Sequence, residues 1–433
     1  MIGAKFSLDG LSPERPPVVV LGDLTLVRPH GVVGIPVILA TRDPHDISLR
    51  SRYVHGGCVL PPAAGVAGAE EGSPAAIAAA AARARSAEVL LDTGERLHRA
   101  LGRKIPLVYG SDKDLELIYL HRRELAEHYA FVLNDEDLAW SLLDKERFSA
   151  VCAAAGVRAP RTLRRDEDLA TVESMREPLL VKPRRKTSWK EIQRDLFDGK
   201  GKARVFPTRR ELLSHPAYAR YRDELIVQEH IGGGIEDLVS FHAFADADGT
   251  LLASFCGQKV RTYPAFAGES SLIKLTSDRE VDAAGRKIAA RLGLKGPFKV
   301  DLIRDGHTGE LYTLEINARY TLWHYLGAVS GVNLPVVAYD LLVHGRRPRQ
   351  VPQPRPEAGY RWLNLYRDWH AYREQRGGGA MGFTTWLRSV THPATVYEAF
   401  SWEDPGPFAW WAGGAVVRKV THGALRDRVG HPR

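Results

Sequence analysis

Short, uninterrupted apolar runs limit what this chain can fold into, because such a run fits a strand that is buried on both faces. Pro17–Leu21 and Gly34–Ala40 are two of these runs, and Ala87–Asp92 and Leu107–Tyr109 repeat the pattern. Their recurrence predicts an open α/β unit over about the first 110 residues. None approaches the roughly 18 residues of a transmembrane helix, so we expect no membrane span.

The composition is that of a folded protein. The chain has 433 residues, of which 44% are hydrophobic and 26% charged, which excludes collagenous and wholly disordered classes. The N-terminal sequence MIGAKFSLDG lacks the regions of a secretory signal. Cys58, Cys152 and Cys256 lie far apart, in no metal-ligand or disulfide spacing. We therefore expect a cytoplasmic protein.

The net charge of +8 is concentrated in two segments. Val181–Arg210 holds eleven Lys or Arg residues against three Asp or Glu, and His344–Arg433 holds fourteen against seven. A local excess of positive charge suits the binding of either nucleic acid or a polyphosphate ligand. The second segment also contains six of the nine tryptophans. Basic and aromatic residues together could bind lipid or nucleic acid, although we favour packing of this segment onto the core.

The rest of the chain mixes predicted helices and strands. Apolar spacing predicts helices at Asp112–Glu127, Asp135–Ala155, Val281–Leu292 and Leu334–His344, and strands at Leu179–Lys182, Leu225–Gln228, Leu238–Ala245 and Leu251–Val260. Loops are expected at Pro61–Pro74 and at Gly232–Gly234. The fold class is therefore α/β or α+β.

A predicted hairpin carries the clearest chemistry. Its strands, Phe298–Ile303 and Glu310–Ile316, are joined across Asp305–Gly309. Pairing about this turn sets Asp301 opposite Glu315 and Lys299 opposite Asn317, with all four side chains on one face. Two carboxylates and an amide oxygen suit Mg²⁺ or Mn²⁺. An ordinary hairpin with a solvated polar face remains the alternative.

Five motifs, in order, resemble those of the ATP-grasp superfamily of ligases. They are Asp144–Lys145, Leu180–Pro183, Val227–Ile231 with the glycines after it, Lys299–Asp301 and Leu314–Asn317. The resemblance covers Arg15 to Gly345 and is greatest to carboxylate–amine ligases of the D-aspartate ligase type. It implies an ATP-grasp fold with an N-terminal pre-ATP-grasp α/β domain (1–112), an ATP-grasp domain of two lobes hinged near 228–234 (113–345), and a C-terminal extension (346–433).

The resemblance also implies roles for individual residues. The nucleotide would be bound by Lys145, Lys182, Gln228, Glu229, Ile231, Glu236 and Lys299, and the metal by Asp301, Glu315 and Asn317. Lys259, Arg261 and Arg319 would lie near the γ-phosphate and the acyl acceptor, where Arg319 would neutralise an acyl phosphate. The basic loop at 199–205 would close over the phosphates.

The activity implied is ATP-dependent joining of a carboxylate to an amine, through an acyl phosphate and with release of ADP and phosphate. ATP and Mg²⁺ or Mn²⁺ would be the cofactors, and an amino acid is the expected amine. The expected carboxylate belongs to a small molecule or to a peptide. A homodimer is compatible with the resemblance, and no nucleic-acid partner is expected. The alternatives are carboxylase or kinase chemistry on the same fold, or a nucleotide- or nucleic-acid-binding protein without turnover.

Overall fold

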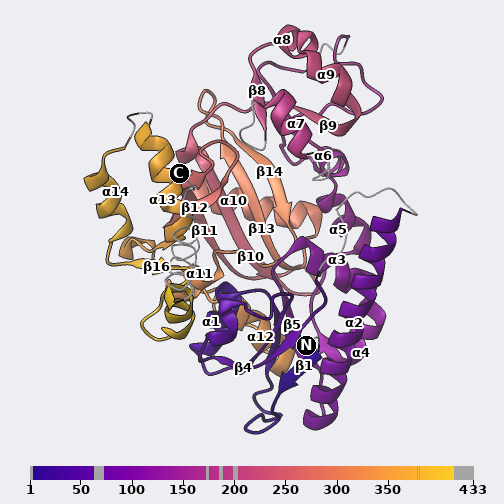
Figure 1. Cartoon of the computed structure of the whole chain (residues 1–433), viewed down its shortest axis with the longest axis vertical. Coiled ribbons are helices and arrows are strands. Elements are labelled where there is room, and N and C mark those ends of the chain that lie inside the picture. Colours follow the sequence, from indigo (N-terminus) through magenta and orange to yellow (C-terminus); the bar gives the residue numbers. More distant parts are fainter. Residues whose placement is uncertain are drawn as a thin grey trace, which may run out of the picture.

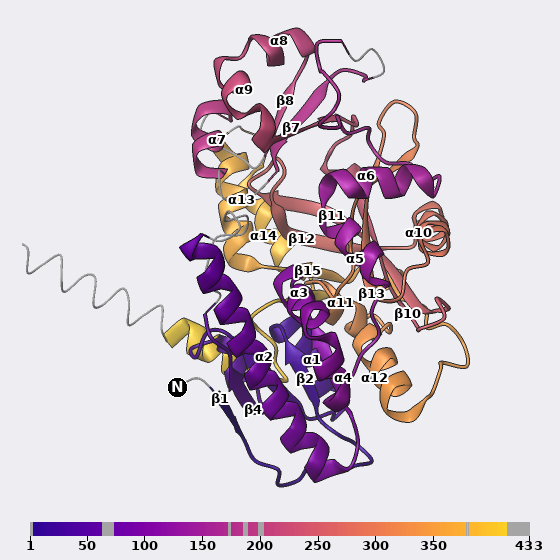
Figure 2. The same cartoon turned by 90° about the vertical axis from the view of Figure 1, so that its right-hand side faces the viewer.

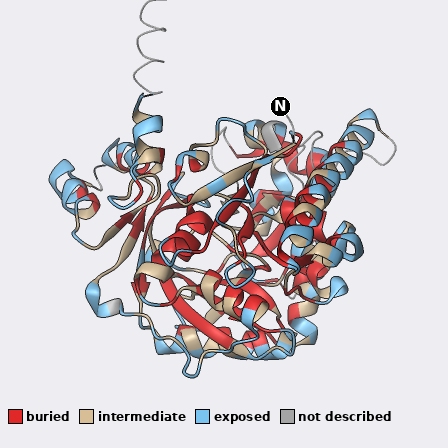
Figure 3. Ribbon diagram, turned by 90° about the horizontal axis from the view of Figure 1, so that it is seen from below, coloured by how far each residue is buried: buried red, intermediate tan, exposed pale blue. Residues whose placement is uncertain are grey.

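The computed structural model describes residues 3–62, 73–171, 175–184, 189–197, 203–377, 379 and 381–413. Three β-sheets form the framework, and the largest lies between an N-terminal unit and a small upper lobe (Figure 1). Buried residues concentrate in the sheets, while the outer helices carry the exposed ones (Figure 3). No helix among the described residues has the length and apolar character needed to cross a membrane. Most of the loop expected at Pro61–Pro74 lies outside the described residues.

The N-terminal unit is a six-stranded sheet in the order β1-β4-β3-β2-β5-β6. Its elements are β1 (Gly3–Phe6), β2 (Val18–Leu21), α1 (Leu24–Gly31), β3 (Val37–Thr41), the 3₁₀ turn Ile47–Arg50, β4 (Val54–Val59), α2 (Pro74–Leu101), β5 (Ile105–Tyr109), α3 (Asp112–Leu120), α4 (Arg122–His128) and β6 (Tyr129–Ala130). The strands predicted at Pro17–Leu21, Gly34–Ala40 and Leu107–Tyr109 are confirmed as β2, β3 and β5, which pair in parallel. The sheet continues through β6, beyond residue 112.

The predicted strand at Ala87–Asp92 is wrong, because this segment lies inside helix α2. Leu90, Leu97 and Leu101 are buried at helical spacing on one face of α2. The helix ends at Gly102, whose φ of 66° is the left-handed conformation that favours glycine. A short apolar run inside an alanine-rich segment fits a helix as well as a strand, so the run alone could not distinguish them.

Strand β4 was not expected from the sequence, because Gly56 and Gly57 interrupt its apolar pattern. The structure explains Gly56, since a Cβ atom at this position would lie 2.3 Å from the Cβ atom of Phe6 in the neighbouring strand β1. A glycine inside a strand thus marks a close approach of two backbones.

Two helices lead from this unit to the small lobe, which is a three-stranded antiparallel sheet in the order β8-β7-β9. The elements are α5 (Glu136–Leu143), α6 (Lys145–Ala154), β7 (Leu179–Pro183), α7 (Trp189–Leu196), β8 (Arg204–Phe206), α8 (Arg209–Ser214), α9 (Pro216–Tyr221), the 3₁₀ turn Arg222–Glu224 and β9 (Leu225–Glu229). Both predicted strands of this lobe are confirmed as β7 and β9. Residues 199–202 of the basic loop lie outside the described residues.

The large sheet has the strand order β14-β13-β10-β11-β12-β15-β16. Its elements begin with the 3₁₀ turn Ile235–Asp237 and include β10 (Leu238–Ala245), β11 (Leu251–Tyr263), β12 (Glu269–Thr276), α10 (Arg279–Leu292), β13 (Gly296–Arg304), β14 (Leu311–Asn317), α11 (His324–Val329) and α12 (Leu334–His344). The predicted register is confirmed, with Lys299 opposite Asn317 and Asp301 opposite Glu315. The expected β10–β11 pair is also confirmed, whereas β12 was not expected.

The C-terminal extension completes the large sheet. It contains the 3₁₀ turn Pro356–Ala358, β15 (Arg361–Leu363), α13 (Leu365–Gly377), α14 (Phe383–Val390) and β16 (Thr395–Tyr397). Strand β15 pairs with β12, and α13 and α14 lie beside the sheet (Figure 2). Packing of aromatic residues onto the core is confirmed for Trp362 and Trp386, which are buried, whereas Trp402 is 87% exposed.

Candidate active site

A cleft of about 670 Å³ lies between the N-terminal unit and the large sheet. Gly22, Thr41 and Gly110 line one wall, and they lie at the carboxyl ends of β2, β3 and β5, where open α/β sheets bind ligands. Six predicted site residues line the opposite wall, namely Lys259, Lys299, Asp301, Glu315, Asn317 and Arg319. The hairpin face predicted from strand alternation therefore faces this cleft.

Asp301 is a buried carboxylate that the surrounding groups keep ionised. The Lys299 Nζ atom lies 2.7 Å from its Oδ2 atom, and the Ser240 hydroxyl donates to its Oδ1 atom at 2.6 Å. Burial alone would raise the pKa of Asp301, but Lys299, Lys259 and Ser240 outweigh burial and hold the pKa below its ordinary value. A negative charge is thus maintained at the cleft wall.

Glu315 and Asn317 supply the other oxygen atoms of the expected metal site. The Glu315 carboxylate makes no hydrogen bond or ion pair with the part of the chain that the structure describes. The Asn317 amide nitrogen lies 3.5 Å from Asp301 Oδ2, and its Oδ1 atom accepts a bond from Arg319 at 3.0 Å. Two carboxylates and one amide oxygen are a donor set that a hard divalent cation accepts, with water completing its shell.

The described residues contain no group of three or more His, Cys, Asp or Glu side chains placed to hold a metal ion. This finding does not count against the hairpin face. Its candidate set contains only two carboxylates, and the third oxygen comes from an amide.

Lys182 lies in β7 of the small lobe, where its Nζ atom donates to Gln228 Oε1 at 3.1 Å. Burial and the nearby charge of Lys145 lower the pKa of Lys182 to about 8, while Glu315 opposes the shift. The two predicted phosphate-binding lysines therefore lie close enough to repel each other. Lys182 is also close enough to Glu315 on the hairpin to interact with its charge.

Lys259 lies on the cleft side of β11. Burial is the main cause that lowers the pKa of Lys259, and the carboxylates of Asp301 and Glu315 oppose this effect. Glu315 thus interacts with Lys182 on the small lobe and with Lys259 inside the cleft.

Arg319 connects the large sheet to the N-terminal unit. Its guanidinium donates to both oxygens of Asp112, at 2.5 and 3.1 Å, and to the carbonyl of Gly110 at 3.2 Å. Because it also donates to Asn317, Arg319 joins the start of α3 to the end of β14.

The residues expected around adenine and ribose lie at the end of β9 and on the loop that follows. The Gln228 amide donates to Thr162 at 3.0 Å, and Glu229 accepts from the Arg176 backbone N–H at 2.9 Å. Ile231 is buried in the hydrophobic cluster that also contains Ile303 and Tyr312. The Glu236 carbonyl accepts a bond from Gln258.

Arg261 does not join the other predicted site residues. The register between β11 and β12 shifts on both sides of Arg261. Its buried guanidinium donates to both oxygens of Asp368, at 2.9 and 2.8 Å, and to the hydroxyl of Ser389 at 2.8 Å. The role expected near the acyl acceptor is corrected accordingly: Arg261 fixes α13 and α14 of the extension to the sheet.

The structure adds cleft residues that no motif indicated. Arg42 and Asp114 form an ion pair of 2.7 Å on the wall contributed by the N-terminal unit. Their only sequence signal is position, since Arg42 follows β3 and Asp114 belongs to the turn that begins α3 after β5. Trp323 lies on the opposite wall, with its ring centre 5.5 Å from Lys299 Nζ.

Two histidines lie beneath this wall. The His242 ring stacks on Phe255 at 4.6 Å and lies 4.8 Å from the Trp323 ring. Burial, followed by nearby positive charge, lowers the pKa of His324 to about 3, and burial also lowers the pKa of His242. Both imidazoles are therefore neutral near pH 7.

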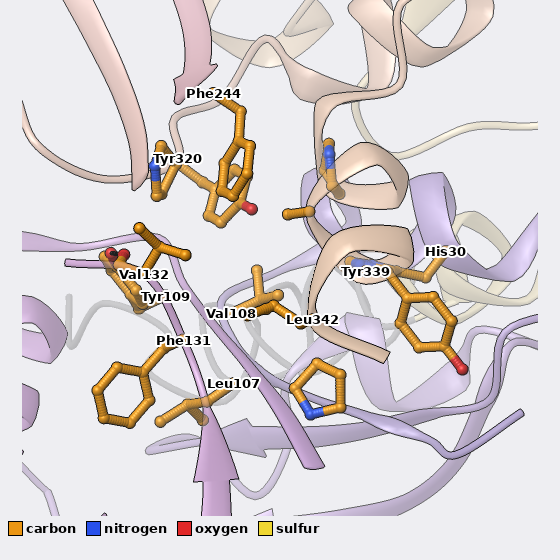
Figure 4. Close-up of a pocket in the computed structure, with 14 residues that line it drawn as sticks. His30, Leu107, Val108, Tyr109, Phe131, Val132, Phe244, Tyr320, Tyr339 and Leu342 are labelled. Atoms are coloured by element: carbon orange, nitrogen blue, oxygen red, sulfur yellow. Dashed lines mark hydrogen bonds between the residues drawn. The ribbon is translucent and has the colours of Figure 1, made fainter. Parts of the chain in front are cut away.

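A second, separate cavity is much smaller. Figure 4 shows that its lining side chains, among them Leu107, Phe131 and Phe244, are mainly apolar. Its volume of about 10 Å³ accommodates at most one water molecule. A substrate does not fit there. Another cavity, of about 540 Å³, lies between α6 and residues 157–167, but none of the predicted site residues lines it. The large cleft is therefore the candidate site.

Comparison with known proteins agrees with this geometry. Residues 144–322 match the family model of the ATP-grasp domain. The chain contains an ATP-grasp domain. This domain includes the two lysines, the β9 segment and the hairpin with the cleft-lining carboxylates.

Among curated proteins, a D-aspartate ligase of Enterococcus faecium (strain Aus0004) is 25% identical over 258 residues. The match covers 57% of this chain and 61% of the relative, so the chain spans less than two thirds of that relative's length.

Solved structures share the ATP-grasp architecture. An L-amino acid ligase from Bacillus licheniformis superposes with a TM-score of 0.52 at 13% identity, over 80% of this chain and 76% of its own. The biotin carboxylase domain of a Hydrogenobacter thermophilus 2-oxoglutarate carboxylase, solved with MgADP and bicarbonate, gives 0.51 at 15% identity, over 77% and 71%. At these identities the likeness shows the fold alone.

Proposed function

We propose that the protein is an ATP-dependent carboxylate–amine ligase that forms an amide or peptide bond. The observation that carries the proposal is the position of Glu315, whose charge interacts with Lys182 on the small lobe and with Lys259 in the cleft. In this proposal Glu315 lies between the phosphate-binding lysine of the small lobe, Lys182, and the part of the cleft beside Lys259, which can hold a second substrate. Similarity to a D-aspartate ligase supports an amino acid as one substrate.

The proposed reaction has two steps. A carboxylate oxygen of the first substrate attacks the γ-phosphorus of ATP, the bond to the β-phosphate oxygen breaks, and ADP leaves. The amine then attacks the acyl carbon, the bond to the phosphate oxygen breaks, and phosphate and a proton are released. Both steps concentrate negative charge on the transferred group, so positioned cations are the main requirement of the site.

The chain supplies these cations from both lobes. In our proposal Lys145 and Lys182 bind the α- and β-phosphates, while Lys259 and Arg319 face the acyl phosphate. The ion pair with Asp112 fixes the position of the Arg319 guanidinium. The cleft still carries positive charge, because Lys259 and Lys299 also line it. Backbone groups at 228–231 would contact adenine, and Glu236 would accept from the ribose.

A divalent cation fits the opposing hairpin residues. Asp301, Glu315 and Asn317 would hold it, with Mg²⁺ as the expected ion. When bound, it would neutralise phosphate charge. Lys299 forms an ion pair with Asp301, and it would keep that carboxylate ionised for the cation.

The test is release of ADP and phosphate from Mg-ATP with a pool of carboxylates, a pool of amino acids, and both pools together. The proposal expects release that needs a carboxylate and increases with an amine, followed by detection of the amide by mass spectrometry. Release with bicarbonate or a carboxylate alone, without an amide product, would indicate carboxylase or kinase chemistry instead. Binding of Mg-ATP in the same samples separates an inactive nucleotide site from a missing substrate.

A further inference from the structure

Two carboxylates on the N-terminal wall of the candidate cleft have no positively charged partner. Asp23, which follows β2, and Asp46, which follows β3, both line the cleft, and we call them the acidic pair. Neither forms an ion pair with the part of the chain that the structure describes. Asp114 on the same wall is neutralised by Arg42 at 2.7 Å. The acidic pair is therefore the part of this wall whose charge is not compensated.

Neutral donors hold both carboxylates in place. The Oδ1 atom of Asp23 accepts from the hydroxyl and from the backbone N–H of Thr25, at 2.6 and 2.8 Å, while its Oδ2 atom accepts no hydrogen bond from the described residues. Asp46 accepts from the Thr41 hydroxyl at 2.9 Å and from the Ser48 backbone N–H at 2.8 Å. These bonds fix the position of each carboxylate but bring no positive charge to it, so the negative charge stays available to a ligand.

The two carboxylates lie close enough to repel each other. Burial raises the pKa of Asp23, and the charge of Asp46 adds to this shift, while the hydrogen bonds from Thr25 oppose it. The positive charge of Arg28 opposes the shift as well, but its guanidinium is bound to Asp404 at 3.1 Å. A positively charged ligand at the acidic pair would offset the repulsion between the carboxylates.

The acidic pair adjoins the segment that holds Arg319. The Arg319 guanidinium donates to the Gly110 carbonyl at 3.2 Å, and the Gly110 backbone N–H donates to the Leu21 carbonyl at 2.8 Å. A Cβ atom at Gly110 would lie 3.7 Å from the Cα atom of Gly22, the residue before Asp23. Because Arg319 and Asp23 also line the same cleft, a substrate that reacts beside Arg319 can extend to the acidic pair.

We propose that the acidic pair binds a positively charged group of one of the two substrates, an ammonium or a guanidinium that does not react. This proposal rests on the proposed ligase function, and it identifies the substrate class: an amine or a carboxylate that carries an additional positive charge. The reacting amine is not the group bound there. It must be neutral to attack the acyl carbon, and two neighbouring carboxylates would keep it protonated.

The experiment compares substrates of matched shape in the full-length protein, each with the complementary pool and Mg-ATP. Ornithine is set against norleucine as the amine, and dimethylglycine against 3-methylbutyrate as the carboxylate, since the tertiary amine of dimethylglycine cannot form the amide. We expect kcat/KM to be higher for the charged member of at least one pair by roughly 10- to 150-fold, the range for one hydrogen bond to a charged group. That pair shows which substrate carries the charge.

Asp23→Asn removes one charge of the acidic pair, and α1 keeps its N-cap because asparagine caps a helix as well as aspartate does. This variant should lower kcat/KM for the charged member nearly to the value for the neutral member, which should itself change little. Asp46→Asn should act in the same direction.

Asp43→Asn is the matched control, because Asp43 is an exposed carboxylate on the loop that carries Asp46 and is not among the residues that line the cleft. This variant should keep the wild-type preference. Equal use of charged and neutral substrates in both pairs, or an equal loss of both members in Asp23→Asn and Asp46→Asn, would overturn the proposal.

Ligand binding without turnover separates this proposal from the proposed function. Calorimetry with the same four compounds, in the presence of a non-hydrolysable ATP analogue, should show tighter binding of the charged member in the wild type and loss of that difference in Asp23→Asn. Such a preference without any amide product would support the acidic pair and count against the ligase reaction. If the protein binds neither charged compound better than its neutral partner, the acidic pair is not a substrate site, whatever the ADP assay shows.

Discussion

Arg28 and Asp404 form a buried ion pair between residues near opposite ends of the chain. The Nε atom of Arg28 lies 3.1 Å from Oδ2 of Asp404, and both side chains are almost completely excluded from solvent. Arg28 also donates to the carbonyls of Glu398 and Ala399 at 2.8 Å, and Asp404 accepts from the hydroxyl of Ser51 at 2.9 Å. The pair connects α1 of the N-terminal unit with the end of the extension.

Removal of one partner of this pair should destabilise the protein strongly. In Asp404→Ala the guanidinium of Arg28 stays buried without a counter-charge, and we expect a loss of about 3–5 kcal/mol in the free energy of unfolding. Urea denaturation followed by circular dichroism measures the change. Asp166→Asn, which removes an exposed ion pair with Arg164, should leave the denaturation midpoint unchanged. If the denaturation midpoint of Asp404→Ala were also unchanged, the Arg28–Asp404 pair would contribute nothing to the free energy of unfolding.

Loss of the hairpin carboxylates should abolish turnover without unfolding the protein. Asp301→Asn and Glu315→Gln keep the size of each side chain while they remove the charge, and we expect ADP release to fall by roughly 100-fold or more. Glu310→Gln is a control just before the same strand, since Glu310 forms an ion pair with Arg158 and is not among the residues that line the cleft. If Glu315→Gln folded normally and kept near-normal activity, the assignment of Glu315 to the active site would be wrong.

Binding of Mg-ATP should take up a proton near pH 8.5. The pKa of Lys182 is lowered to about 8, first by burial and then by Lys145, so a large share of the side chain is neutral at this pH. A phosphate next to the amine favours the charged form and raises the pKa, and binding therefore draws a proton from solution.

Calorimetry in buffers of different ionisation enthalpy measures this proton uptake. Lys182→Arg should bind Mg-ATP without it, because arginine remains charged throughout the range. Identical proton uptake in both proteins would assign the titrating group elsewhere.

Glu398 should make stability depend on pH. Burial, and then the charge of Asp23, raises the pKa of Glu398 to about 7. Between its ordinary pKa of 4.5 and about 7 the folded state holds this proton while the unfolded state has lost it. The contribution to stability therefore decreases as pH rises through this window and is fully lost above it.

Glu398→Gln should remove this pH dependence and stabilise the protein at pH 8 by about 2 kcal/mol. Thermal or urea unfolding at pH 5.5 and pH 8 measures both effects. Glu403→Gln, an exposed position on the same segment, is the control and should follow the wild type. A variant at Glu398 that kept the wild-type pH dependence would contradict the assignment.

The sequence predicted the hairpin face well, because strand alternation and turn position fix which side chains share a face. Asp301 and Glu315 are opposite each other for this reason. Arg261 was misplaced because a shift in strand register changes the side to which a residue points, and nothing in the local sequence marks this shift. Arg42, after β3, and Asp114, in the first turn of α3, are 72 residues apart and meet only in the folded protein, so no local pattern could pair them.

The sheet order β12-β15-β16 has a consequence for how the chain is made. The strand that covers the edge of β12 and the carboxylate that neutralises Arg28 leave the ribosome well after β12 and Arg28 themselves. Until then a nascent chain carries an open sheet edge and a guanidinium without its counter-ion, both of which favour association with chaperones or other chains. Helix α1 therefore reaches its final environment only after the 376 residues that separate Arg28 from Asp404 have been made.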